Sequence, residues 1–248
     1  MTAHLTSTCI IAAMICTAAA LALSPGSIRF RRIGRLFLAA GLVFQLCGLI
    51  ARGWLGGVFL ANPIMEAPYL LPACLTVLAL IPRPVDRRQV VLTALAALAL
   101  AFLLFFPRGM IPPTPRKTTI LATLFFFTEG AAYALFIAGA GLAGLQLAQR
   151  KAAGFHSFVV WGFVVFSASQ IIGAMWSFQG WGVTFMWGPR HLSTAAIWVI
   201  YAAYLHLRFL PRWSEKKRAL FALAAALLVI LVSYGHSLHE MNFPRIGG

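Results

Sequence analysis

The chain has 248 residues, of which 61% are hydrophobic and 10% are charged, and its formal net charge is +15. Soluble domains contain about a quarter charged residues, so this composition indicates a membrane protein. The positive charges lie between apolar segments rather than on one polar face, which favours basic anchors at a membrane surface and disfavours nucleic-acid binding. The four cysteines form no Cys-x-x-Cys pair, which disfavours a dithiol site.

Long apolar segments recur along the whole chain. A membrane-spanning helix needs roughly 20 mostly apolar residues, and eight segments approach that length. They cover residues 5–23, 36–52, 64–82, 89–107, 118–148, 156–176, 192–210 and 217–236. No soluble domain separates them. The sequence therefore predicts an all-α integral membrane protein in which residues 1–248 form a single domain, a bundle of about eight transmembrane helices.

The distribution of basic residues predicts how the bundle is oriented. Fourteen of the 20 Lys and Arg residues fall in the first, third, fifth and seventh connections between spans. Connections rich in Lys and Arg stay in the cytoplasm, so both termini and the tryptophan-rich sixth connection, about 176–192, are predicted to be external. The fourth connection, 107–117, does not follow this pattern, since it holds three positive charges. A multi-pass protein of a bacterial-type inner membrane is expected.

Two carboxylates stand in or beside the apolar segments. An unpaired charge in lipid costs at least about 2.5 kcal/mol, so the carboxyl of Glu129 is expected to be protonated, paired or exposed to an aqueous cavity. A structural bond between helices and a functional role are equally compatible with Glu129, and a transport path through it is a weaker alternative. Glu66 suits either an interfacial anchor or a cavity wall, whereas Gln45 and Gln170 are expected to link helices.

Histidines are the candidate metal ligands. His4 and His156 are expected to be solvated at the ends of spans. His206 falls inside the seventh span, where a hydrogen-bonded structural role competes with ligation. His236 and His239 follow the last span, and a His-x-x-His pair lies on one helical face. Imidazole is a common ligand of haem iron, and zinc is the rival metal, with Glu240 as its only further ligand nearby.

The sixth connection is dense in aromatic side chains. Trp176, Trp181, Phe185 and Trp187 are followed closely by Arg190. Tryptophans gather at the interface of any membrane protein, so an aromatic belt is one interpretation. A platform for a flat ligand is the other, because indoles stack on a planar ring and an arginine pairs with a carboxylate such as a porphyrin propionate.

Residues 181–192 carry a family resemblance. They read Trp-Gly-Val-Thr-Phe-Met-Trp-Gly-Pro-Arg-His-Leu, which resembles the signature of the cytochrome c assembly family, approximately Trp-Gly-x-Tyr-Trp-x-Trp-Asp-Pro-Lys-Glu-Thr. The flanking segments 173–176 and 198–208, the segment 62–66 and, more weakly, residues 132–133 are similar to its CcsA-like branch. Together these segments are spread over residues 62–208, rather more than half of the chain. Gly188 and His191 replace the two acidic residues of the signature.

This resemblance implies a set of haem-binding residues. In the family the signature forms an external haem platform, two external histidines ligate the iron, and two intramembrane histidines hold haem on its way out. His206 matches one intramembrane histidine, and His236 or His239 matches one external histidine. Val58 and Phe125 stand at the other two histidine positions. The implied cofactor is haem b, and the implied binding residues are Trp176, Trp181, Phe185, Trp187, Arg190, His206, His236 and His239, with His206 and His239 as iron ligands.

The function implied by the resemblance is haem presentation. A CcsA-like protein would hold haem at the outer face of the membrane for cytochrome c maturation, as part of a haem-attachment (synthetase) system. Its partners would be haem, membrane lipid, an apocytochrome c and a separate membrane subunit with a large external domain. The alternative is a divergent, non-catalytic relative that serves as a regulatory or structural subunit of a membrane complex.

Overall fold

The structure is a computed structural model of the chain. It describes residues 2–24, 27–55, 63–81, 87–105, 118–149 and 154–234. Within these ranges the chain is helical and contains no β-strand. The helices are α1 (Thr2–Leu23), α2 (Ile28–Leu55), α3 (Pro63–Leu80), α4 (Arg87–Leu103), α5 (Ile120–Gln149), α6 (Phe155–Trp181), α7 (Pro189–His206), the short 3-10 helix η2 (Leu207–Phe209) and α8 (Glu215–Tyr234).

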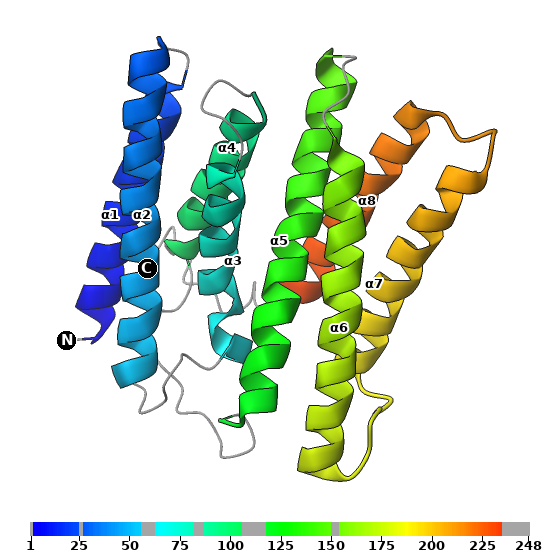
Figure 1. The fold of residues 1–248 in the computed structure, drawn as a ribbon. Helices are drawn as coiled ribbons and strands as arrows, with labels where there is room; N and C mark the ends of the chain where they lie inside the picture. The colour runs from blue at the N-terminus through cyan, green and yellow to red at the C-terminus, as the bar shows by residue number, and fades with distance from the viewer. Residues whose placement is uncertain are drawn as a thin grey trace, which may run out of the picture.

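Successive helices run up and down through one bundle (Figure 1). The start of α1, the end of α2 and the link between α6 and α7 lie at one end, and the start of α2 and the link between α7 and α8 lie at the other. Basic residues therefore gather at the end opposite the α6–α7 link, as the sequence predicts. Which end is external stays a prediction.

The helices have the length and composition of membrane spans. By these two criteria, α1, α2, α5, α6 and α7 can each cross a membrane. The other three, α3, α4 and α8, are 18, 17 and 20 residues long and pack alongside them. Large apolar side chains such as Trp161 and Ile171 point outward, which suits a lipid-facing surface. The predicted class, an all-α membrane protein, is confirmed, and the described ranges contain the eight expected α-helices.

Two predicted boundaries were wrong. Helix α2 begins at Ile28 rather than near residue 36, so the four arginines of the first connection lie in its first turns. Their long side chains let the helix continue beyond the apolar span while the charges stay in a polar layer. Helix α6 continues to Trp181, so Trp176 and Trp181 are helical and the connection itself is only 182–188.

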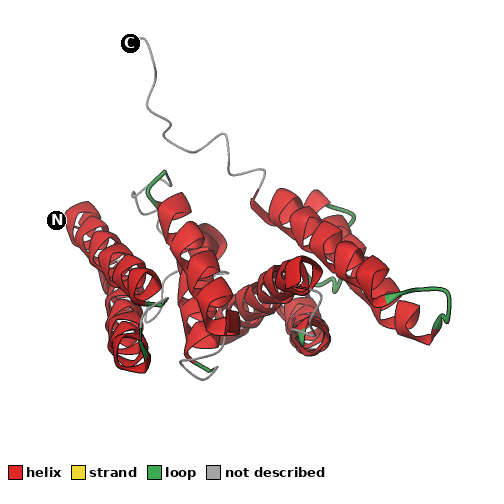
Figure 2. Cartoon of the chain, turned by 90° about the horizontal axis from the view of Figure 1, so that it is seen from above, coloured by secondary structure: helices red, strands yellow, loops and turns green. Residues whose placement is uncertain are grey.

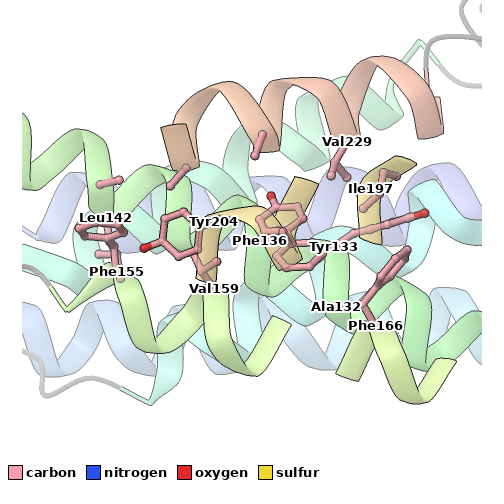
Figure 3. Close-up of a cluster of buried hydrophobic side chains, with 14 of the residues drawn as sticks. Ala132, Tyr133, Phe136, Leu142, Phe155, Val159, Phe166, Ile197, Tyr204 and Val229 are labelled. Atoms are coloured by element: carbon pink, nitrogen blue, oxygen red, sulfur yellow. The ribbon is translucent and has the colours of Figure 1, made fainter. Parts of the chain in front are cut away.

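Seen from above, the helices form pairs in a curved row, and α5 lies near the centre (Figure 2). It packs against α3, α4, α6 and α8. The largest core cluster fills the space between α5, α6, α7 and α8 (Figure 3). Phe136 and Tyr201 stack there with ring centroids 3.5 Å apart. Gly162 of α6 allows this contact, because a Cβ at that position would lie 2.7 Å from the Phe136 ring.

Two polar contacts lie in the first half of the bundle, and one of them tests a sequence prediction. Gln45 of α2 donates to the Thr76 hydroxyl of α3 at 3.1 Å, which confirms the predicted link between helices. Arg52 lies within α2 and is buried, with its guanidinium 4.2 Å from the centre of the Tyr69 ring.

Candidate functional site

The link between α6 and α7 is a tight turn with defined ends. Gly182 caps α6 with φ 74°, a left-handed conformation that favours glycine, and its N–H donates to the carbonyl of Phe178 at 2.8 Å. Helix α7 begins at Pro189, whose fixed φ suits a first helical position, after an extended Gly188. The two helices are thus tied together by seven residues, 182–188.

A cavity of about 670 Å³ lies between α6, α7 and this link. Helix α6 lines it with Gln170, Gly173, Ala174, Trp176, Ser177 and Trp181. The link and α7 line it with Thr184, Phe185, Met186, Gly188, Pro189, Arg190, His191, Thr194, Ala195, Trp198 and Val199. Phe125 of α5 completes the wall. Small-molecule sites measure about 300–1,000 Å³, so the cavity is large enough for a cofactor.

Aromatic rings form one side of the cavity. Phe125 stacks on Trp176 with centroids 5.8 Å apart, and Phe126 meets the same indole edge-on at 5.6 Å. Trp181 packs edge-on against Trp176 at 5.3 Å. Because Trp176 is buried by these neighbours, its indole is held in one orientation at the cavity wall.

A polar network stands beside the aromatic side. The Nη2 of Arg190 lies 2.5 Å from a carboxylate oxygen of Glu129, and the hydroxyl of Tyr133 donates to the other oxygen at 3.2 Å. The Glu129 side chain is 5% exposed and that of Arg190 is 48% exposed. Arg190 also lies over the rings of Phe125 and Phe126, 5.6 and 5.4 Å from their centroids. The pair joins α7 to α5, and Arg190 presents positive charge to the cavity.

Trp198 lines the cavity on the side away from the link. Its indole N–H donates to the Ser167 hydroxyl of α6 at 3.0 Å, and its ring lies 5.3 Å from that of Phe163. Helices α6 and α7 are therefore bridged at Trp198 as well as at the link.

A family model described as cytochrome C assembly protein matches residues 62–241. The chain belongs to the cytochrome c assembly protein family. Its matched segment covers α3 to α8 and hence the whole cavity.

Similar proteins extend this assignment. The cytochrome c biogenesis proteins CcsA of Prochlorococcus marinus strains MIT 9303 and AS9601 are 33% and 38% identical over 86 residues, or 35% of this chain. The match spans about a quarter of those relatives' length, 27% and 26%. A solved structure, the cytochrome c heme lyase CcmF, shares the fold with TM-score 0.67 at 17% identity, over 96% of this chain and 50% of its own.

Some of the predicted haem-binding residues line the cavity, and others do not. Trp176, Trp181, Phe185 and Arg190 all line the cavity. Trp187 does not, since its side chain is 85% exposed and touches the group only through Phe185, at 5.4 Å. Its position is that of an interfacial aromatic anchor.

His206 does not line the cavity. It is the last residue of α7, seven residues after the cavity-lining Val199, which corresponds to roughly 10 Å along a helix axis. Its ring is exposed, and Nδ1 lies 2.8 Å from the carbonyl of Ala202. The buried face of α7 carries Tyr201 and Tyr204 instead.

Other predicted residues have different outcomes. Glu129 is paired, one of the three states expected for it, and it lies behind Arg190 rather than among the cavity-lining residues. Gln170 was expected to link helices, but its amide donates to its neighbour Ser169 and it lines the cavity. His156 was expected to be solvated, but it is partly buried with Nδ1 3.1 Å from the Tyr204 hydroxyl.

Four predicted positions lie outside the described residues or side chains. His236, His239 and Val58 are outside the described residues. Glu66 belongs to the first turn of α3, and its side chain is outside the described part.

Several cavity residues were missed as binding residues in the sequence. On α7 they are His191, Thr194 and Trp198, spaced three and four residues apart on one helical face. On α6 they are Gln170, Ala174 and Ser177, which the same spacing relates to the predicted Trp181. Extending the aromatic signature into both helices at this spacing would have found them.

Proposed function

We propose that this protein holds haem b in the α6–α7 cavity, at the outer face of the membrane, for the maturation of c-type cytochromes. The observation that carries the proposal is the cavity itself, which combines aromatic walls with one cation in a member of the cytochrome c assembly family. The basic residues at the opposite end of the bundle support an external position.

The cavity fits the ring of a porphyrin. Its walls are mostly apolar, and Trp176, Trp181 and Phe185 offer aromatic surface to a flat molecule. Gly173, Ala174, Thr194 and Ala195, which also line the cavity, have small side chains that leave room for a ligand.

The cavity also fits the acidic edge of such a molecule. A guanidinium has five N–H donors, and the bond to Glu129 leaves donors of Arg190 for a propionate. The first turn of α7 adds the positive end of a helix dipole beside Arg190. Arg190 is thus positioned to orient the ligand, and Glu129 and Tyr133 to position Arg190.

Haem, when bound, supplies the vinyl groups to which two reduced cysteine thiols of an apocytochrome add as thioethers. The contribution of this chain would be to bind and orient the ring, exclude water from its face and leave one edge accessible at the link. An apocytochrome c and a separate membrane subunit with a large external domain are the proposed partners. His206, at the opposite end of α7, would serve only a second haem position, and His239 remains a proposed ligand outside the described residues.

Absorption spectra of the purified protein test the proposal. We expect a Soret band after expression with haem supply, and a change in the visible bands on reduction. Trp181→Ala should weaken haem binding about tenfold, because an aromatic contact contributes about 0.5–1.5 kcal/mol beyond its buried area. Trp161→Ala is the matched control, since this indole is on the same helix but faces outward. A wild-type protein without a Soret band under these conditions contradicts haem binding.

A second function is favoured by one specific observation. Phe125 fills its position with a ring packed between Trp176 and Arg190, and Arg190 already has a partner in Glu129. Phe125 and Arg190 therefore already have protein partners without a ligand, as expected of a non-catalytic relative that regulates or supports a membrane complex. Normal c-type cytochromes in cells that lack this protein, together with its co-purification with another membrane complex, would favour this second function.

A further inference from the structure

One imidazole faces the cavity. The described part of the chain contains four histidines, His4, His156, His191 and His206. Of these, His191 alone lines the cavity. His4 is exposed near the start of α1, and the rings of His156 and His206 are bonded to the Tyr204 hydroxyl and the Ala202 carbonyl.

The ring of His191 is held in place without using its nitrogens. It packs edge-on against Phe185, with centroids 5.2 Å apart, and it is partly buried. Within the described residues, neither ring nitrogen has a hydrogen-bond partner, and the side-chain bond that reaches His191 goes from Thr194 to its backbone carbonyl. The imidazole is thus oriented by an aromatic contact while both nitrogens remain available.

Neighbouring residues fix which way His191 points. Pro189 sets the start of α7, and residues that follow each other on a helix point about 100° apart. Because Arg190 is held toward α5 by Glu129, His191 lies on the side of α7 toward Phe185 and the link. The same ion pair that presents the cation to the cavity therefore also sets the direction of the imidazole.

We propose that His191 coordinates the iron of haem held in this cavity. The proposal rests on the proposed haem binding and names its ligand. Neutral imidazole is a common protein ligand of haem iron and needs one nitrogen free of other partners. Phe125, which forms the opposite part of the wall, has no ligating atom. Coordination in the described part of the cavity would accordingly come from α7 rather than from α5.

The alternative for His191 is the role of an ordinary polar residue at the membrane interface. An interfacial histidine interacts with water and lipid headgroups, and its removal leaves the spectrum of a bound haem unchanged. A ligand to iron alters the spin state and the affinity when it is removed, and added imidazole can replace it. These two roles thus differ in a spectroscopic measurement that does not depend on cytochrome maturation.

The test compares purified wild type, His191→Ala, His191→Gln and the control His4→Ala, each titrated with haem. His4 is an exposed imidazole at the same end of the bundle, so His4→Ala removes a histidine without touching the cavity. We expect His191→Ala and His191→Gln to change the spin state and to weaken haem binding by at least about 10–100-fold, the effect of losing even an outer partner of a metal ligand. Added imidazole should restore the wild-type spectrum to His191→Ala.

Three outcomes separate the two proposals. A spectrum and affinity unchanged in both His191 variants overturn coordination by His191 and leave haem binding standing. A wild-type protein that binds no haem overturns both. Loss of binding in His191→Ala that imidazole does not restore, with a normal spectrum in His191→Gln, also overturns coordination, because glutamine then preserves a structural role. Circular dichroism of each variant shows whether it is folded.

Discussion

Two pairs of consecutive antiparallel helices in this bundle differ in how closely their helices approach each other. In the α1–α2 pair, Gly34, Gly41 and Gly48 recur every seven residues along α2 and face α1. A Cβ added at any of the three would lie 3.2–3.3 Å from an atom of α1, such as the Cys9 Cβ opposite Gly48. Small residues let the two backbones approach closely, as is typical of helices in membranes.

The α6–α7 pair is joined at two separate points. Trp198 bridges the helices at one point, and the link 182–188 joins them at the other. Between them the facing residues are small, including Ala174 on α6 and Thr194 and Ala195 on α7. Large side chains set the separation and small ones leave it unfilled, which produces the cavity of about 670 Å³. Two cavities described in the first half of the bundle hold about 20 Å³ each.

The comparison shows that small residues alone do not close a helix pair. Gly180 and Gly188, beside the α6–α7 link, have no atom within 4 Å of an added Cβ. Whether the two helices approach closely depends on the residues that flank the small ones. Along α2 these are further small residues, whereas along α6 and α7 they are tryptophans. The α6–α7 pair needs an anchor to a third helix, which the bond between Arg190 and Glu129 provides.

Removal of that anchor should have the largest effect. Arg190→Ala leaves the Glu129 carboxylate buried with Tyr133 as its only partner among the bonds described here. Breaking a buried ion pair costs about 3–5 kcal/mol, and the half-exposed Arg190 places the expected loss in free energy of unfolding at or below the lower end of that range. Chemical unfolding in detergent micelles measures it.

A double-mutant cycle provides the control for this prediction. Glu129→Gln keeps a polar partner for Tyr133 and should cost less than Arg190→Ala. The combined variant should lose less stability than the two separate losses added together, because the second substitution removes a group that already lacks its partner. Strictly additive losses would show that the pair does not anchor α7.

Placing a large side chain in the contact between α1 and α2 should have the next largest effect. Gly41→Leu introduces a side chain where an added Cβ already lies 3.3 Å from Cys16 and Thr17. Overpacking a tight contact costs about 1–3 kcal/mol. Gly180→Leu is the matched control on α6, where the space is open and leucine also favours the helix, so its unfolding free energy should change by less than about 0.5 kcal/mol. Equal losses in both variants would contradict the contrast between the two pairs.

The helices themselves could be predicted because each apolar span is a local feature of the sequence. Their ends could not, since arginines at the start of α2 and tryptophans at the end of α6 are polar or amphipathic yet helical. Helix α6 stops only where Gly182 adopts its left-handed conformation, a choice that depends on the turn that follows.

The site was predictable only where one short segment contains it. Trp181, Phe185 and Arg190 were found because they fall within twelve residues of a family signature. The partner of Arg190 is 61 residues away on α5, and this pairing arises from the bundle rather than from either segment alone. The role inferred for His191 likewise depends on its direction, which no pattern in the sequence gives.

Loosening the contact between α6 and α7 at Trp198 should have the smallest effect. Trp198→Phe keeps an aromatic ring against Phe163 but removes the N–H that bonds to Ser167. A hydrogen bond of this kind contributes about 0.5–1.5 kcal/mol, and the exposed part of the ring favours the lower end. Ser167→Ala should give a similar loss in the free energy of unfolding, and the two substitutions together should cost no more than either alone. If haem binding weakens in these variants while stability stays constant, Trp198 shapes the cavity through its indole rather than by holding α6 and α7 together.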